Sequence, residues 1–382
     1  MSARLDLTGL TAAPSQVWGG VRLVPLVRDE PITDLRLHAE LHGDGLGVVP
    51  VGRRTGYWSY IPHAFVATWS GDDGPAAAYG TSLGPAGGHG APPRVPVRVH
   101  RRMAGRAGRG KLRFLPVHLA LEGYLALHFG GPSVVWDEWS QRAVRNGLSP
   151  REEQAYAGTD VRDLADALKV FEIHPGQCGV VVHVADSLAA AFVVPHPDDY
   201  RALHATLVQD LYGELVHHYA TYAAPVPEFR ARVDDAYVRS LADLRAAAGR
   251  QRAEWSRFHD GTMAAGLLDA TYSVRRVHRL GDYALSRFLP AFRPRRENHI
   301  GELITDHRGR TAYLKTFRLS EAQVRRGHLL SRLGDHDWHL PSAAGALGLT
   351  EAQLGLRLDS AGLGFLLRED VLARYRASKI NG

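Results

Sequence analysis

The sequence predicts an α+β fold: a β-rich N-terminal domain with one long packing helix, then an α-helical C-terminal region. Apolar runs of strand length fill much of the first 195 residues, and capped helical segments follow residue 319. Strands and helices do not alternate regularly, which argues against a doubly wound parallel sheet. We expect three units, residues 1–224, 225–318 and 319–382.

The composition is that of a globular protein. Of 382 residues, 45% are hydrophobic and 23% charged. The single cysteine, Cys178, excludes an internal disulfide and a cysteine-based zinc site. The N-terminus lacks the apolar segment of a signal peptide, and no apolar run is long enough to span a membrane. We therefore expect a cytoplasmic protein without a membrane partner.

The net charge of +6 needs a cautious interpretation, because only four of the 46 basic residues are lysines. An excess of arginine beside abundant Ala and Gly is typical of GC-rich coding. Basicity alone is therefore weak evidence for nucleic-acid binding, and the positions of the charge clusters matter more.

Several secondary-structure elements can be placed. We expect strands at residues 21–27, 95–100, 111–121 and 124–129, and two buried strands within 178–194. Residues 196–220 carry an apolar stripe at helical spacing, with Asp198 as the N-cap. Residues 228–290 are expected to be mainly helical, and residues 302–317 to form a hairpin that turns at Arg308 and Gly309.

The C-terminal region has the pattern of a helix-turn-helix. Ser320 and Thr350 are N-cap residues, Gly334 is expected to end the first helix, Pro341 begins the second, and Gly348 supplies a turn. The segment resembles the Fis/NtrC-type helix-turn-helix at Trp338, Ala343, Ala344, Leu347, Gly348, Leu349, Leu354, Arg357, Leu358, Gly362 and Leu363. This resemblance implies that residues 351–360 enter the major groove of DNA.

The candidate DNA contacts are few. Thr350 and Gln353 could read base edges, while Arg357, Arg325 and Arg326 could bind phosphates. Glu351 and Asp359 oppose this, because they add negative charge to the same helix. The alternative is that these helices serve packing or bind a protein partner.

The densest basic cluster lies between two predicted strands. It consists of Arg101, Arg102, Arg106, Arg109 and Lys111, interrupted by glycines. Such a segment could bind the phosphates of a nucleotide-like ligand, because glycine lets backbone amides approach an anion. The alternative is a solvated loop, since the spacing is not that of a P-loop.

Neither a metal nor a catalytic site is predicted. Asp210, Glu214, His217 and His218 lie near one another on a predicted helix, but a solvated polar face explains them better. His174 and His183 fit satisfied strand histidines, and Cys178 a buried, inert thiol. No residue is therefore assigned as catalytic, and no cofactor is expected.

The whole chain resembles the ARPP family, whose name refers to ADP-ribosylglycohydrolases and the rhodanese-phosphatase superfamily. The resemblance rests on "LALEGYLALHFGGPSVVWDEWSQRAV", "GVVVHVADSLAAAFVVPHPDDYRALHATLVQDLYGELV" and "AYLKTFRLSEAQVRRGHLL" with "DWHL". It implies a cytosolic bacterial protein linked to NAD or ADP-ribose metabolism, and it implies no catalytic residue.

Three functional hypotheses follow. The leading one is a ligand-responsive DNA-binding protein, in which a nucleotide-like ligand near Arg101–Lys111 alters the C-terminal helices. The second is an enzyme acting on an ADP-ribose-type phosphorylated substrate, with Asp137, Glu138 or Asp198 facing the arginines. The third is a scaffold that forms a homodimer through its C-terminal helices.

Overall fold

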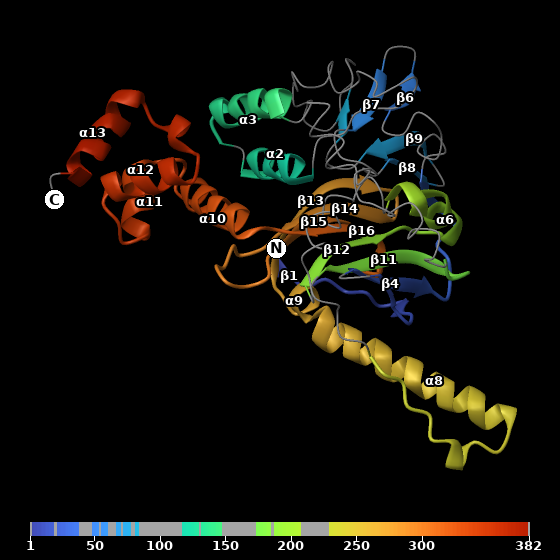
Figure 1. Ribbon diagram of the computed structural model, residues 1–382. Coiled ribbons are helices and arrows are strands. Elements are labelled where there is room, and N and C mark those ends of the chain that lie inside the picture. Colours follow the sequence, from blue (N-terminus) through green and yellow to red (C-terminus); the bar gives the residue numbers. More distant parts are fainter. Residues whose placement is uncertain are drawn as a thin grey trace.

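A computed structural model describes residues 2–18, 21–37, 48–52, 55–59, 66–69, 72–77, 81–83, 117–129, 131–146, 173–184, 187–207 and 229–380. Its centre is a ten-stranded antiparallel sheet in the order β1-β13-β14-β15-β16-β12-β11-β4-β2, with β3 also paired to β4 (Figure 1). The strands are β1 (Ser2–Ala3), β2 (Leu10–Ala12), β3 (Gln16–Trp18), β4 (Val21–Arg28), β11 (Gln177–Val184), β12 (Ser187–Val193), β13 (Tyr272–Leu280), β14 (Tyr283–Leu289), β15 (His299–Thr305) and β16 (Thr311–Arg318).

The order of the strands does not follow the chain. The hairpin β15–β16 lies in the middle of the sheet, where β16 pairs with β12 along Ala190–Val193. The hairpin turns at Arg308 and Gly309 as predicted, because the Asp306 carboxylate accepts the backbone N–H groups of Arg308 and Arg310. The sheet therefore continues across the unit boundary predicted near residue 225.

Both faces of the sheet are buried. On one face, Val180, Val182 and Phe192 pack against Tyr124 of α2 (Val117–Phe129) and Tyr200 of α6 (Pro197–Thr206). On the other face, the core is closed by Trp255 of α8 (Leu241–Phe258) and Leu267 of α9 (Ala265–Leu268), with η4 (His259–Met263) between these helices. A strand covered on both faces has a continuous apolar sequence, as β11 does.

Helix α2 replaces two predicted strands. The sequence suggested strands at 111–121 and 124–129, whereas Val117–Phe129 is one helix. Its residues are apolar on nearly every side, so the spacing carries no helical stripe, and a short buried helix cannot then be distinguished from a strand. The helix is followed by α3 (Ser133–Asn146), whose Trp139 donates its indole N–H to Leu119 O.

Helix α6 begins slightly earlier than the sequence suggested. Its N-cap is His196, whose Nδ1 accepts the backbone N–H of Asp198, and Pro197 occupies the first turn. Asp198 is therefore a first-turn residue, where a carboxylate favours the positive end of the helix dipole.

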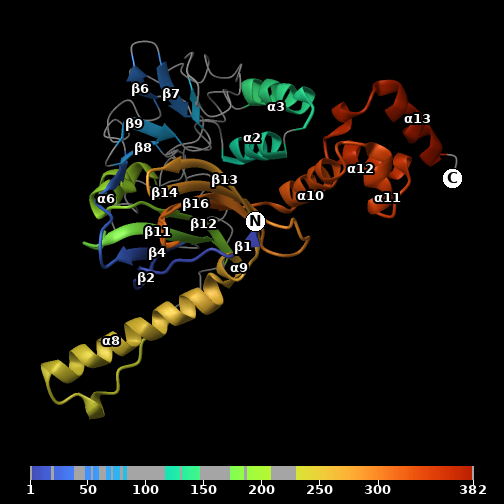
Figure 2. The same cartoon turned by 180° about the vertical axis from the view of Figure 1, so that it is seen from behind.

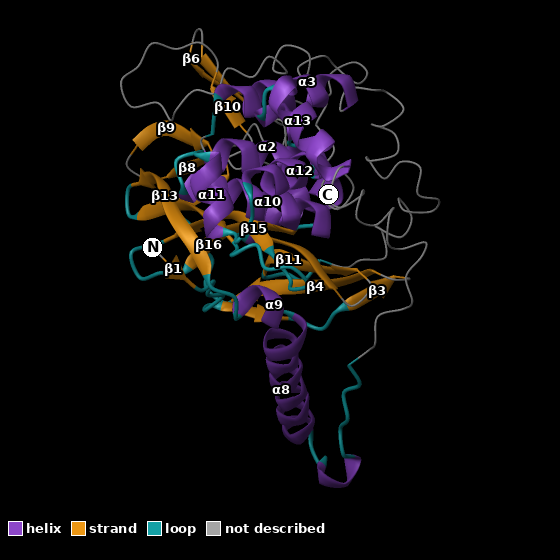
Figure 3. Ribbon diagram, turned by 90° about the vertical axis from the view of Figure 1, so that its left-hand side faces the viewer, coloured by secondary structure: helices purple, strands orange, loops and turns teal. Residues whose placement is uncertain are grey.

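Helix α8 projects away from the sheet (Figure 3), and the segment from Phe229, including η3 (Asp235–Tyr237), runs back beside it. Residues 228–290, expected to be mainly helical, thus contain α8, η4 and α9 and then the strands β13 and β14. Among the residues placed by the structure, no helix is long and apolar enough to cross a membrane.

Two three-stranded sheets lie beyond the α2 face of the large sheet (Figure 1). One has the order β10-β7-β6 and the other β5-β8-β9. Their strands are β5 (Leu35–Leu37), β6 (Val48–Gly52), β7 (Thr55–Ser59), β8 (Val66–Trp69), β9 (Asp72–Ala77) and β10 (Thr81–Leu83).

The C-terminal helices and α8 lie on different sides of the large sheet (Figure 2). They are α10 (Glu321–Asp335), α11 (Leu340–Ala346), α12 (Glu351–Ser360), η5 (Gly364–Leu366) and α13 (Glu369–Ile380). Helix α10 runs past the predicted Gly334 end to Asp335, and the backbone then reverses through Asp337 and Trp338, both with positive φ.

Candidate nucleic-acid interface

The three helices α10, α11 and α12 share a small core of their own. Its buried members are Leu329, Leu330, Leu333, Ala343, Ala344, Leu354, Leu358 and Leu363. Ala343 and Ala344 are almost completely buried, so a larger side chain there would separate α11 from its neighbours. Leu347 and Leu349, two positions of the helix-turn-helix resemblance, are partly buried at the margin of this cluster.

Local sequence explains how the helices begin and turn. Both α10 and α12 carry a capping box, in Ser320 with Gln323 and in Thr350 with Gln353. Gly348 has φ +64°, a conformation that glycine adopts without steric penalty, and it forms the turn between α11 and α12. The polar atoms of Thr350 and Gln353 thus have a structural role beside any contact with DNA.

The exposed side of α12 carries one arginine, Arg357, beside the exposed acid Glu351. Gln353 and Arg357 are exposed and lie one turn apart, at i and i+4, on the same face. Asp359 forms a bidentate ion pair with Arg376 of α13, with Nη2 2.8 Å from Oδ2. This pairing offsets one of the two acids that opposed DNA binding.

Helix α13 covers one flank of α12. A Cβ atom on Gly355 would lie 2.5 Å from Cδ2 of Tyr375, so only glycine permits this approach. The Tyr375 ring fills the space that a side chain at position 355 would occupy, so Gly355 serves helix packing.

The two arginines of α10 that were predicted to bind phosphates differ in position. Arg325 is 65% exposed, and its nearest acid is Glu321 at 3.7 Å. Arg326 is 16% exposed and directs Nη1 to the Glu122 carboxylate of α2 at 2.7 Å. Arg325 is therefore available for a phosphate contact, whereas Arg326 is occupied within the protein.

Glu122 connects the C-terminal helices to the rest of the chain. It also lies 3.2 Å from Arg142 of α3, so one partly buried carboxylate bridges α2, α3 and α10. Beside this bridge, Trp338 packs on Gly131, where a Cβ would lie 2.2 Å from the indole ring. The cavity next to Glu122 and Glu138 has a volume of about 30 Å³, room for water but not for ADP-ribose.

The remaining predicted site residues lie elsewhere. The phosphate-binding candidates Arg101, Arg102, Arg106, Arg109 and Lys111 fall outside the described residues, as do Asp210, Glu214, His217 and His218. Asp137 is exposed on α3, and Asp198 pairs with Arg201 at 3.0 Å. That Asp137 or Asp198 faces the arginines Arg101–Lys111 therefore stays a prediction.

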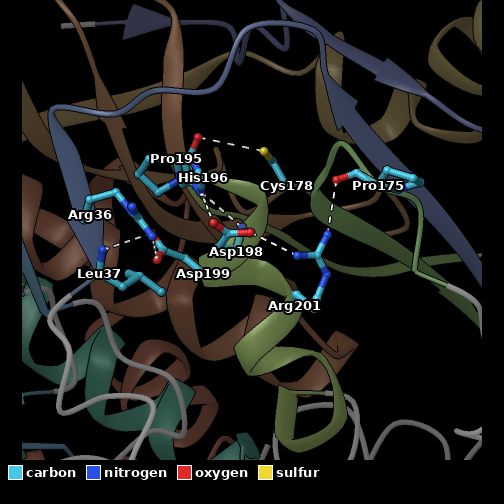
Figure 4. A network of polar contacts seen from close by, with 9 residues as sticks. All are labelled: Arg36, Leu37, Pro175, Cys178, Pro195, His196, Asp198, Asp199 and Arg201. Atoms are coloured by element: carbon cyan, nitrogen blue, oxygen red, sulfur yellow. Dashed lines mark hydrogen bonds and ion pairs between the residues drawn. The ribbon is translucent and has the colours of Figure 1, made fainter.

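A polar network surrounds the N-terminus of α6 (Figure 4). Asp199 is buried and accepts two bonds from Arg36, at 2.7 and 3.0 Å, and one from the backbone N–H of Leu37. Cys178 lies nearby, 3.8 Å from Pro195 O, and burial raises the pKa of its thiol. A buried thiol with a raised pKa is a poor nucleophile, in keeping with the inert role expected for it.

Sequence reasoning missed a row of charged residues on the α2 face of the sheet, of which Glu302 and Lys315 are buried and Arg287 partly buried. Arg287, Glu302 and Lys315 are directly opposite one another on β14, β15 and β16, and burial lowers the pKa of Lys315 to about 7. Burial, together with Arg287 and Arg275, lowers the pKa of His128 to about 4. The available signal in the sequence was a hydrophilic residue within each apolar strand. To see that these residues face one another, the order of the strands must be known.

A family model named ARPP-2 matches residues 5–281, more than half of the chain. The chain belongs to the ARPP-2 family. The family resemblance found in the sequence is thereby confirmed, while a link to ADP-ribose metabolism remains a prediction. The match ends before β14, β15, β16 and α10–α13, so this ARPP-2 protein completes its central sheet with strands beyond the matched residues.

No curated protein and no solved structure matches this ARPP-2 chain. Its candidate interface is therefore judged from its own geometry.

Proposed function

We propose that residues 319–363 of this ARPP-2 protein form a helix-turn-helix that binds DNA through the exposed face of α12. The observation that carries the proposal is the pair Gln353 and Arg357, exposed on one helix face that begins at a capped turn. Gln353 is suited to an adenine edge and Arg357 to a phosphate or a guanine.

Three further features support this proposal. The helices α10–α12 have their own apolar core, which holds α12 at the surface. Arg325 adds an exposed cation on α10, and Arg376 neutralises Asp359. With so few cations, we expect modest affinity and a shallow dependence on salt.

The test is binding of the full chain to mixed-sequence duplex DNA between about 50 and 200 mM salt. We expect Arg357→Ala to weaken binding and to reduce the salt slope by about one. Arg374→Ala, which removes an exposed arginine of α13, is the matched control and should leave binding nearly unchanged.

Gln353→Glu separates base contacts from helix capping. Glutamate also forms a capping box at this position, so α12 should remain intact while the amide donor is lost. Sites selected from a random DNA library should then change in sequence. If neither Arg357→Ala nor Gln353→Glu alters DNA binding, the proposal is wrong.

We further propose that a nucleotide-like ligand regulates this binding through Arg101–Lys111. The alternation of arginine and glycine supports this second part. ADP-ribose, NAD and inorganic phosphate should each be tested for a shift in melting temperature and in DNA affinity. If none of these ligands shifts the melting temperature or the DNA affinity, the proposed regulation by a ligand is wrong, and the proposed DNA binding is unaffected.

A further inference from the structure

Exposed apolar side chains concentrate on one projecting feature, which we call the arm: residues 229–258, comprising α8 and the segment beside it. Among the residues placed by the structure, seven large hydrophobic side chains are exposed. Five of them belong to the arm, namely Val233, Tyr237, Leu241, Leu244 and Phe258. Such a concentration marks an interaction surface rather than the scatter usual on a monomer.

The arm is poorly supported by its own chain. Of the 18 residues of α8, only Ala247 and Trp255 are buried. Trp255 fixes the lower end, where its indole N–H donates to Ala13 O and its ring contacts Phe229. At the far end, Leu241 is 72% exposed and Tyr237 77% exposed. Most of a helix's stability in a protein comes from packing of its apolar face, and the far end of α8 lacks such packing among the described residues.

The apolar residues of α8 follow a heptad pattern. Intervals of three and four residues place them in a single seam, the arrangement by which helices pair side by side. The seam consists of the apolar residues Leu241, Leu244, Ala248, Trp255 and Phe258, with the polar Gln251 at one of its positions. The lower part is covered by Phe229 and by the Arg232–Gln251 bond, and the upper part, at Leu241 and Leu244, is open.

Charge is distributed unequally along the arm. The tip, residues 233–245, has three carboxylates and two arginines, whereas residues 229–232 and 246–258 have one carboxylate and five arginines. None of these arginines forms an ion pair with a residue that the structure places. Two arms side by side in the same direction would bring the basic halves together, whereas an antiparallel pair brings each acidic tip to a basic half.

We propose that the arm is the interface with a second copy of this chain, in which two α8 helices pair antiparallel about a twofold axis. Each copy offers the same open part of the seam, at Leu241 and Leu244, which is the self-complementarity that a twofold contact requires. Specific interfaces bury at least about 1,200 Å², so both arms must lie along one another rather than touch at their tips. The inference does not depend on DNA binding.

The first test is the mass of the full chain in solution, measured by light scattering and sedimentation between about 1 and 100 µM. We expect a dimer that becomes monomeric in Leu241→Glu/Leu244→Glu. Val134→Glu, which changes an exposed valine of α3, is the matched control and should remain dimeric. A monomeric parent chain, or a dimer unaffected by the double change, would overturn the proposal.

The second test determines the relative direction of the two α8 helices by disulfide cross-linking. The buried Cys178 is replaced by serine in every chain, so that only the introduced cysteines can react. Chains with Tyr237→Cys should form a disulfide with chains carrying Arg252→Cys, because the antiparallel pair brings the tip to the basic half. Chains with Tyr237→Cys alone should not cross-link to themselves, as a parallel pair would require. Self-cross-linking at position 237 would exclude the antiparallel arrangement.

The arginines of the arm provide a third test. Arg250→Glu/Arg252→Glu should weaken the dimer about tenfold or more, and Asp234→Arg/Asp235→Arg in the same chain should restore it. If the parent chain is monomeric and the arginine changes abolish nucleic-acid binding instead, the arm contacts nucleic acid and the dimer proposal fails.

Discussion

The Nε2 atoms of His183 and His259 lie 3.4 Å apart, and both imidazoles are completely buried between β11 and η4. His259 Nδ1 lies 2.9 Å from the Asp260 carboxylate, which can only accept, so this nitrogen carries a proton. In the contact between the two Nε2 atoms, one nitrogen donates and the other accepts. His183 Nδ1 is buried and has no hydrogen-bond partner among the described residues.

This histidine pair predicts that the folded chain loses stability in acid. Burial, with His259 and Arg22 nearby, lowers the pKa of His183 to about 3, against about 6.5 in the unfolded chain. Between these values the unfolded chain binds the extra proton, so stability is full above about pH 6.5 and is lost as the pH falls towards 3. The slope for one such group is about 1.4 kcal/mol per pH unit.

Unfolding by urea between pH 7.5 and 5 measures this loss. His183→Gln should flatten the pH dependence, and His278→Gln, at an exposed position of β13, should not. Other histidines with lowered pKa, such as His128 and His299, leave part of the slope in place. An identical slope in the His183 variant would contradict the assignment.

A second pH dependence comes from Lys315. Its folded pKa is lowered from 10.5 to about 7 by burial, although Glu302 opposes the shift. The unfolded chain therefore holds one more proton between about pH 7 and 10.5, and stability rises with pH across that window. Lys315→Met should reduce the rise measured by urea unfolding between pH 7.5 and 9.5. An unchanged slope would show that the amine is not desolvated.

Gly355→Ala is expected to release α13 from α12, because the new methyl group meets the Tyr375 ring. Hydrogen exchange should become faster in residues 369–380, while α10 and α11 remain protected. Adding Gly355→Ala to a chain that already carries Tyr375→Ala should instead stabilise it by about 1 kcal/mol, through helix propensity alone. Faster exchange throughout α10–α12 would contradict this separation.

Glu122→Gln should weaken the junction of α2, α3 and α10 by about 1–2 kcal/mol, because Arg326 and Arg142 lose their shared carboxylate. Urea unfolding and hydrogen exchange in α10 measure the effect. Asp137→Asn, which changes an exposed acid on the same helix as Arg142, serves as the control. Equal effects of the two changes would show that the bridge adds no stability.

The parts of this fold set by neighbouring residues could be predicted from the sequence. Ser320, Thr350 and Gly348 act within one helical turn, so the starts of α10 and α12 and the turn between α11 and α12 agree with the prediction. The Asp306–Arg310 turn is local in the same way.

Contacts between residues far apart in the chain explain where the structure differs from the sequence-based predictions. Gly355 depends on Tyr375 from a later helix, and Arg326 on Glu122, which is 204 residues away in the chain. Helix α2 has apolar residues on nearly every side, which removes the stripe that identifies a helix. The central place of β15–β16 is set by pairing with β12, and no periodicity in a single strand encodes its neighbours.

The position of β15–β16 bears on how the chain folds during synthesis. Strands β4, β11 and β12 are made early, yet β12 obtains its neighbour β16 only after residue 318 has left the ribosome. Until then, an apolar strand edge is open to other chains. A nascent chain stalled before residue 299 should therefore engage chaperones or aggregate, although it already contains every residue of the family match.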